Sequence, residues 1–335
     1  MKNLVTGASG LVGIHIVLDL LKKGETVYAT YTRNSSLKNV KKVFEFYNSA
    51  TLFEKINWIE MNLEDITQVF DGVKEMDFVY HSAAIVSFNK KDQAKISSIN
   101  IRGTANIVNA CVDEKIKKLG FISSVASIGR KANKQGLYSE KSKWHISKAN
   151  SFYAISKYKA ENEVWRGIQE GLNAVIVNPG IILGPSDWNR SSTTIFRQIY
   201  SGLSFYPTGS NGFVDVRDVS RSIIKLVEST INSERYILVG ENISYKSVFE
   251  KIANELKVKA PNKKATKSLL ELAWRIEKLK CIFTRNSPNL TKETARTSYQ
   301  DNNYSNEKIK TSLNFEFNSI ENAIKNTTKF LLKFN

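Results

Sequence analysis

A glycine-rich turn near the start of the chain is the feature that most constrains the fold. Residues 3–6 suit a short apolar strand, and residues 7–13 follow with the sequence GASGLVG. Apolar residues at helical spacing come next, Gly24 is placed to end that helix, and residues 26–31 are typical of a second strand. A strand, a glycine turn, a helix and a strand within about thirty residues form a dinucleotide-binding unit. The glycines let the backbone approach a pyrophosphate, and the helix N-terminus presents N–H groups to its charge.

Alternating strand and helix patterns continue beyond this unit. Further strands are predicted at residues 56–60, 78–81, 119–123, 174–178 and 235–239, and helices at 92–112, 153–170, 191–201 and 215–229. Repeated β-α units predict the α/β class, with a Rossmann-type, doubly wound parallel sheet that has helices on both faces. We expect this domain to span residues 1–179, completed by a helix and a strand from 213–240. Residues 180–212 and 241–335 would form a smaller, mostly helical substrate-binding part.

The chain from residue 244 onward is mostly helical and rich in lysine. Residues 266–283 carry apolar side chains at helical spacing, namely Leu269, Leu272, Ala273, Ile276, Leu279 and Phe283. Such a stripe usually packs in a core, so a helix that lines the substrate cleft is the first interpretation. A helix on a membrane surface is the alternative, because Trp274 and the flanking Lys and Arg residues suit a peripheral membrane contact.

The formal net charge of +17 is high for a chain of 335 residues. Its densest part is 257–267, which contains five lysines and no acid. A basic chain can bind nucleic acid, an anionic membrane or an acidic ligand. The helix-turn-helix signature and the aromatic-basic interleaving of nucleic-acid binders are not seen. We therefore predict a solvated basic surface and no nucleic-acid partner.

Apolar runs and cysteine content favour a cytoplasmic protein. No apolar run reaches the ~18 residues that a membrane span needs. The first strand begins at Lys2, which leaves no room for a signal peptide. Cys111 and Cys281 are too few for a disulfide framework, which suits a reducing compartment. Neither lies in a His-rich stretch, so we predict no metal site.

Tyr153 and Lys157 lie four residues apart in a predicted helix and so share one face. A cation beside a phenol favours the phenolate, and we therefore expect Lys157 to lower the pKa of Tyr153. The phenol could then exchange a proton near neutral pH. An isolated pair of this kind usually belongs to a solvated helix face, but the motifs elsewhere in the chain favour the catalytic interpretation.

Seven motifs in order give the chain a family resemblance. They are TGASGLVG at 6–13, HSAA at 81–84, NIRGT at 100–104, SS at 123–124, YAISK at 153–157, NPG at 178–180 and VDVRDV at 214–219. In this order they resemble the extended short-chain dehydrogenase/reductases, also called the NAD-dependent epimerase/dehydratase family. The remainder of the chain matches that family only in general character.

The resemblance implies the chemistry of the site. In the family a serine holds the substrate oxygen, a tyrosine transfers its proton, and a lysine holds the nicotinamide ribose and depresses the tyrosine pKa. These roles fall to Ser124, Tyr153 and Lys157, with Ser123 a poorer candidate than Ser124. Asn100 matches an asparagine that orients the cofactor or a relay water. Hydride would pass between nicotinamide and a carbonyl carbon while the two hydroxyls donate hydrogen bonds to the carbonyl oxygen.

We expect NADP(H) rather than NAD(H) as the cofactor. After the second strand the chain reads TRNSS at 32–36, with no acid to bind a ribose 2′-OH, and Arg33 can meet a 2′-phosphate. Asn62 and Leu63 replace the family's usual Asp-hydrophobic pair at the adenine, and the amide oxygen can still accept a hydrogen bond there. Cofactor contacts are expected from Gly7, Ser9, Gly10, Leu11, Val12, Gly13, Arg33, Asn62, Leu63, Ala83, Ala84, Tyr153, Lys157 and Pro179.

The expected substrate is an apolar ketone or secondary alcohol. Ser124 is followed by VAS rather than by the acidic pair of the sugar dehydratases, and Asn211 stands where epimerases typically carry an arginine for the diphosphate. SSVASIG at 123–129 and GP at 184–185 look more like the dihydroflavonol-reductase and 3β-hydroxysteroid-dehydrogenase branch. A sugar-nucleotide epimerase is the alternative, with Arg190 or Arg197 as the clamp.

Two further expectations follow from the resemblance. Relatives that only sense a cofactor typically lose the tyrosine or the lysine, so a non-catalytic NADP-binding regulator is less favoured. Family members often pair through two helices of each subunit, which here are the predicted helices 92–112 and 153–170, so a homodimer is expected.

Overall fold

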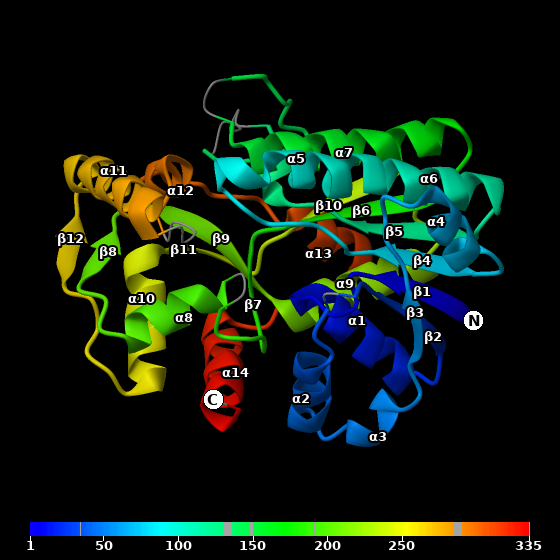
Figure 1. Ribbon diagram of the computed structural model, residues 1–335, viewed down its shortest axis with the longest axis horizontal. Helices are drawn as coiled ribbons and strands as arrows, with labels where there is room; N and C mark the ends of the chain where they lie inside the picture. The colour runs from blue at the N-terminus through cyan, green and yellow to red at the C-terminus, as the bar shows by residue number, and fades with distance from the viewer. Residues whose placement is uncertain (34, 130–135, 148–149, 190–191, 285–289, 335) are drawn as a thin grey trace.

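A seven-stranded parallel sheet forms the framework of this computed structural model (Figure 1). The structure describes residues 1–33, 35–129, 136–147, 150–189, 192–284 and 290–334. The strand order is β10-β6-β5-β4-β1-β2-β3, with neighbouring strands parallel. The strands are Lys2–Thr6 (β1), Thr26–Tyr31 (β2), Asn57–Glu60 (β3), Phe78–His81 (β4), Lys118–Ile122 (β5), Ala174–Pro179 (β6) and Glu234–Leu238 (β10). The predicted Rossmann-type sheet is confirmed, and each strand lies within a residue or two of its predicted position.

Helices cover both faces of the sheet, as Figure 1 shows. One layer contains α1 (Leu11–Lys22), α2 (Lys38–Phe46), α3 (Ala50–Phe53) and α9 (Val216–Glu228), and the other contains α4 (Ile66–Val73), α6 (Gly103–Asp113) and α7 (Phe152–Gln169). Successive strand residues point to opposite layers: Val5 packs in the core with α1, whereas Leu4 packs in the core with α6 and α7. Both faces of the sheet are therefore buried, which is why its strands are apolar without alternation.

The predicted helix at 92–112 is continuous but changes its winding. It runs through a short 3-10 turn (Lys90–Asp92, η1), α5 (Gln93–Ile96), a π-helical turn (Ser97–Arg102, η2) and α6. Asn100 lies in the π turn. Such turns inside α-helices are often found at functional sites.

Short strands that the sequence pattern did not predict accompany the helices of the remaining chain. β7 (Ile181–Leu183), β9 (Ser210–Asp215) and β11 (Glu241–Ser244) form a three-stranded sheet, and β8 (Phe205–Pro207) pairs with β12 (Lys263–Ala265). The helices are α8 (Thr193–Tyr200), α10 (Tyr245–Leu256), α11 (Lys267–Thr284), α12 (Lys292–Ser298), α13 (Glu307–Leu313) and α14 (Ile320–Lys333). Val177 of β6, Ile252 of α10 and Ile324 of α14 share one core, so the proposed domain boundaries stay a prediction.

α11 matches the helix predicted at 266–283, and its described side chains divide between a packed face and an exposed one. Leu270 and Trp274 pack with Ala295 of α12, whereas Leu272 and Ile276 are exposed. The side chains of Leu279 and Phe283 lie outside the described part. Among the described helices, none is both long and apolar enough to cross a membrane.

Candidate active site

The turn between β1 and α1 needs glycine at two positions for reasons of packing. Gly7 has a φ of +66°, and a Cβ added to it would lie 2.7 Å from the backbone of Ala83. A Cβ on Gly13 would lie 2.3 Å from the carbonyl oxygen of Gly7. Gly10 differs, because the nearest neighbour of an added Cβ is the Gly7 oxygen at 3.2 Å. Its bare backbone therefore leaves a cradle open at the start of α1.

This cradle has the properties of an anion site. Gly10 is the N-cap of α1, makes no side-chain capping bond, and no acid occupies the first turn of the helix. The first N–H groups of a helix have no partner within the helix, and its N-terminus carries a partial positive charge. Ser9, Leu11 and Val12 border the opening and are half-buried. The residues present fit a dinucleotide pyrophosphate.

The segment after β4 forms the adjoining wall. Ser82 donates to the carbonyl oxygen of Thr6 (2.7 Å), and the Ala83 N–H donates to the Thr6 hydroxyl (3.3 Å). These bonds hold Ala83 against the glycine turn and leave Ala84 exposed. His81 itself is buried between the hydroxyls of Thr6 and Thr104, and burial lowers its pKa to about 3. It has a structural role as a neutral ring.

The carboxyl ends of β2 and β3 show an ion pair that the sequence pattern did not predict. Arg33 Nε lies 2.7 Å from Glu60 Oε1, and the Arg33 side chain is 87% exposed. Thus an acid does stand next to Arg33, contributed by β3 rather than by the end of β2. Asn62 Oδ1 accepts from the Glu64 N–H (3.1 Å), and Leu63 is buried against Gly103 of α6.

Tyr153 and Lys157 lie on the inner side of α7, facing the carboxyl end of β5. Ser151 caps this helix by accepting from the Ala154 N–H, which sets the helix start just before Tyr153. Lys157 Nζ is buried, donates to the carbonyl oxygen of Ile122 (2.8 Å), and lies 4.6 Å from the centre of the Phe121 ring.

The pKa of Tyr153 departs from the expectation. Burial, the larger influence, raises it, and the nearby Ser124 hydroxyl acts in the opposite direction. The expectation that Lys157 lowers this pKa is wrong for this structure, because the phenol loses water while the ammonium donates to β5 instead. Burial also lowers the pKa of Lys157 to about 8, against the attraction of Glu161.

Ser124 follows β5 and begins a 3-10 turn (Val125–Ser127, η3), where its hydroxyl accepts from the Ala126 N–H at 3.1 Å. Its side chain lies near that of Tyr153 and influences the pKa of the phenol. Ser123 donates instead to the buried Glu161 at 2.7 Å. The choice of Ser124 over Ser123 as the candidate donor to a substrate stays a prediction.

Asn100 uses its amide to tether other segments. Its Oδ1 accepts from the Ile85 N–H (2.7 Å), and its Nδ2 donates to the Ile85 oxygen (3.0 Å) and to Ser156 (3.1 Å). Ser156 in turn donates to the carbonyl oxygen of Tyr153 (2.7 Å). Asn100 therefore joins the segment after β4 to the first turn of α7, which suits a positioning residue.

Glu161 is the residue that the sequence reasoning missed. It lies one turn beyond Lys157 on α7, is 1% exposed, and accepts hydrogen bonds at both carboxylate oxygens. Its donors are Ser123, Ser127, Asn178, Trp165 and Arg235. The spacing to Lys157 could have suggested a shared face, but most of the partners come from distant segments: the stretch after β5, β6 and β10. Pro179 follows Asn178 at the buried end of β6.

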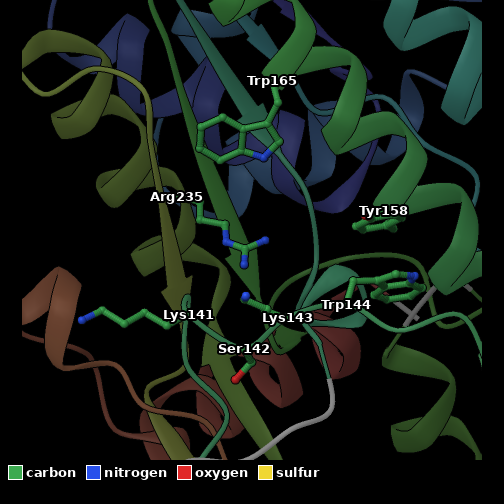
Figure 2. Close-up of a pocket in the computed structure, with 7 residues that line it drawn as sticks. All are labelled: Lys141, Ser142, Lys143, Trp144, Tyr158, Trp165 and Arg235. Atoms are coloured by element: carbon green, nitrogen blue, oxygen red, sulfur yellow. The ribbon is translucent and has the colours of Figure 1, made fainter.

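An open pocket of about 470 Å³ lies on the flank of α7 (Figure 2). Trp144 and Tyr158 stack in its wall with ring centroids 4.5 Å apart. Figure 2 shows Lys143 turned toward the Arg235 guanidinium, whereas Lys141 points away. Arg235 pairs with Glu161 at 2.8 Å. None of the predicted site residues lines this pocket. We therefore keep the candidate active site at Ser124 and Tyr153, apart from the pocket. Within the described residues, no cluster of side chains could hold a metal ion.

Comparison with known families agrees with this geometry. The model of the NAD dependent epimerase/dehydratase family matches residues 3–240. The chain belongs to this family. It is an NAD(P)-dependent enzyme of the short-chain dehydrogenase/reductase superfamily, and nicotinamide is the cofactor of this family.

The curated relatives of the chain include reductases, and the solved structures that share its fold include epimerases. A putative dihydroflavonol 4-reductase from Synechocystis sp. is 29% identical over 96% of this chain and 91% of its own length. Cinnamoyl-CoA reductase CAD2 of Medicago truncatula is 29% identical over 75% of this chain and 79% of its own. The crystal structure of gox2253 is 26% identical with a TM-score of 0.80, covering 99% of this chain and 98% of that one. A UDP-glucose 4-epimerase from Thermotoga maritima has a TM-score of 0.78 at 19% identity, covering 99% of each chain, and so shares the fold.

Proposed function

We propose that this protein is an NADP(H)-dependent dehydrogenase or reductase acting on a ketone or secondary alcohol. The Ser124 side chain near the Tyr153 phenol, with the buried Lys157 one helical turn from Tyr153, is the observation that carries the proposal. A bound nicotinamide would supply or accept the hydride. Ser124 and Tyr153 would donate hydrogen bonds to the reacting oxygen, where charge develops, and Tyr153 would transfer its proton.

Lys157 would hold the cofactor ribose and stabilise the phenolate electrostatically. Its ammonium is bound to the Ile122 oxygen, so this role requires the ammonium to shift toward Tyr153. Asn100 would keep the segment after β4 and the start of α7 in register, through Ile85 and Ser156.

The NADP(H) preference rests on Arg33. The described ion pair with Glu60 uses Nε, and the terminal nitrogens of the exposed guanidinium can face a 2′-phosphate. The same Glu60 carboxylate would repel that phosphate, so the preference depends on which of the two charges lies nearer. Arg33 is the more mobile partner because its side chain is longer and 87% exposed.

Apolar surface beside the phenol supports an apolar substrate. The ring of Phe88 lies 5.7 Å from that of Tyr153, and Phe88 and Val86 are both exposed. Asn211, at the position of the epimerase clamp, is bound to the Tyr245 hydroxyl (3.1 Å) and to its neighbour Gly212. Arg197 is bonded to Asn189. Arg190 lies outside the described residues.

Two ligand panels test the substrate class. Calorimetry and NADPH oxidation would be measured on the cofactor complex with hydrophobic ketones and with UDP- and GDP-sugars. We expect turnover with members of the first panel and no saturable response to the second. Micromolar binding of a sugar nucleotide, without any response to ketones, would favour an epimerase. Tight NADPH binding with no turnover of either panel would favour the cofactor-sensing regulator. The expected homodimer, through the stretch 90–113 and α7, can be checked by analytical ultracentrifugation.

A further inference from the structure

One face of α11 is apolar and open to solvent. Leu272 and Ile276 lie one helical turn apart and are each 56% exposed. Leu270 and Trp274, which pack with α12, are displaced from them by two residues, or about 200° around the helix. α11 therefore sits on the protein by one side and presents apolar side chains on the other. Exposed apolar surface of this kind typically marks a binding face.

A basic segment leads into this helix. β12 leads directly into α11 and pairs with β8 at the same end of the molecule (Figure 1). Five lysines of the segment 257–267 are exposed, namely Lys257, Lys259, Lys263, Lys264 and Lys267. Among the described side chains, no carboxylate lies within ion-pair distance of any of them. Their charge is therefore available to a partner.

An exposed aromatic ring lies beside one of these lysines, and one acid of α11 is already paired. Lys263 Nζ lies 5.7 Å from the centre of the Phe205 ring, which is itself 40% exposed. Of the two acids on α11, Glu271 is paired with Arg275 (3.1 Å) and accepts from the Trp274 indole (3.0 Å). The surface thus combines unpaired lysines with exposed apolar and aromatic side chains.

The charge decides which partner fits. A second copy of this chain would bring the same five lysines and another formal charge of +17 to the contact, so repulsion opposes self-association there. An anionic lipid surface offers the opposite charge to the lysines, and its headgroup-acyl boundary accepts Leu272 and Ile276. α11 is not apolar enough to span a bilayer, which fits a helix lying in the plane of the interface.

We propose that α11 and the lysines of 257–267 dock this enzyme onto an anionic membrane surface, with Leu272 and Ile276 inserted at the level of the headgroups. The docking does not depend on the proposed reaction. It would place the family's cofactor-dependent chemistry next to apolar molecules that partition into the bilayer.

Vesicle sedimentation of the full chain tests the proposal. We expect binding to phosphatidylcholine vesicles that contain phosphatidylglycerol, weak binding to phosphatidylcholine alone, and loss of binding at high salt. The double variant Leu272→Ser/Ile276→Ser should lower the partition coefficient by about tenfold or more, because two apolar side chains no longer insert. Lys263→Glu/Lys264→Glu should lower it by at least about tenfold.

Matched controls on α14 separate docking from a general charge effect. Leu332→Ser removes an apolar side chain that is 50% exposed, and Lys325→Glu/Lys329→Glu makes the same charge change at exposed positions. Both should bind vesicles as the unaltered chain does, and all variants should keep its melting temperature. Equal losses in the α14 variants would overturn the assignment of the surface. Equal binding to the two kinds of vesicle would overturn the membrane proposal. So would a protein that fails to bind vesicles but binds an oligonucleotide, if the α11 variants abolish that binding.

Discussion

Glu161→Gln tests how the catalytic side of α7 is held. Five donors surround this buried carboxylate, and Arg235 carries the only positive charge among them, at 2.8 Å. Removing one partner of a buried ion pair typically costs about 3–5 kcal/mol of unfolding free energy. Arg235 is 20% exposed, and the Asn178 amide can turn its unbonded Oδ1 toward the new glutamine. We therefore expect a loss near the lower limit, about 3 kcal/mol.

The same substitution should act on Lys157. The negative charge of Glu161 opposes the burial that lowers the pKa of Lys157 to about 8. Without that charge the pKa falls further, and a larger share of Lys157 is neutral near pH 8. Turnover that requires the ammonium should then decline as pH rises, beginning at a lower pH than in the unaltered protein.

Urea denaturation and pH-rate profiles measure the two effects separately. Glu163→Gln is the control, because Glu163 lies on the same helix but pairs with Arg166 (2.9 Å) at the surface, where such pairs contribute about 0–1 kcal/mol. A Glu161→Gln protein as stable as the Glu163→Gln protein would refute the reasoning about the buried ion pair. An unchanged pH-rate profile in a destabilised variant would leave Glu161 a purely structural residue.

Four further predictions concern the candidate site. Tyr153→Phe should lower turnover by roughly 10²–10⁴-fold with little change in cofactor affinity by titration, and near-normal turnover would contradict the proton-transfer role. Lys157→Met should weaken both turnover and cofactor binding. Because burial lowers the lysine pKa from 10.5 to about 8, the contribution of Lys157 to stability is full above pH 10.5 and is lost as pH falls through 8. From pH 8 to 10.5 the unaltered protein should therefore gain about 3 kcal/mol of unfolding free energy relative to the variant, and parallel stability curves would disprove this. Arg33→Ser should weaken NADPH binding by about tenfold and leave NADH binding unchanged in calorimetry, whereas tighter NADH binding by the unaltered protein would overturn the preference. His81, with a pKa lowered from 6.5 to about 3, should make stability fall by about 1.4 kcal/mol per pH unit as pH drops below 6.5, and His81→Gln should remove that slope in acid denaturation.

Local patterns predicted most of the parallel sheet. β2 and β4 begin and end where the sequence placed them, and Asp215, the first residue of the predicted helix 215–229, caps α9 by accepting from the Arg217 N–H. The short strands β7, β9 and β11 were missed, because three to six residues carry too little periodicity to stand out. Their pairing depends on residues from three separate parts of the chain, and this information is absent from any one window of sequence.

Part of the candidate site could likewise be predicted from the sequence, and part could not. The glycine turn and the Tyr153–Lys157 spacing were evident from the sequence, since a turn and one helix face are set by neighbours within a few residues. The ion pair of Arg33 with Glu60 was not evident from the sequence. No acid directly follows β2 in the chain, and the acid beside Arg33 comes from the adjacent strand β3.

The sequence by itself determined the order of elements, the glycine cradle and the residue types available for proton transfer, because short-range geometry settles these. Only the tertiary structure decided their electrostatics. It raises the pKa of Tyr153 through burial, turns Lys157 toward Ile122, and brings partners of Glu161 from the stretch after β5, from β6 and from β10. The physical reason is that desolvation and charge pairing depend on which distant segments exclude water from a group.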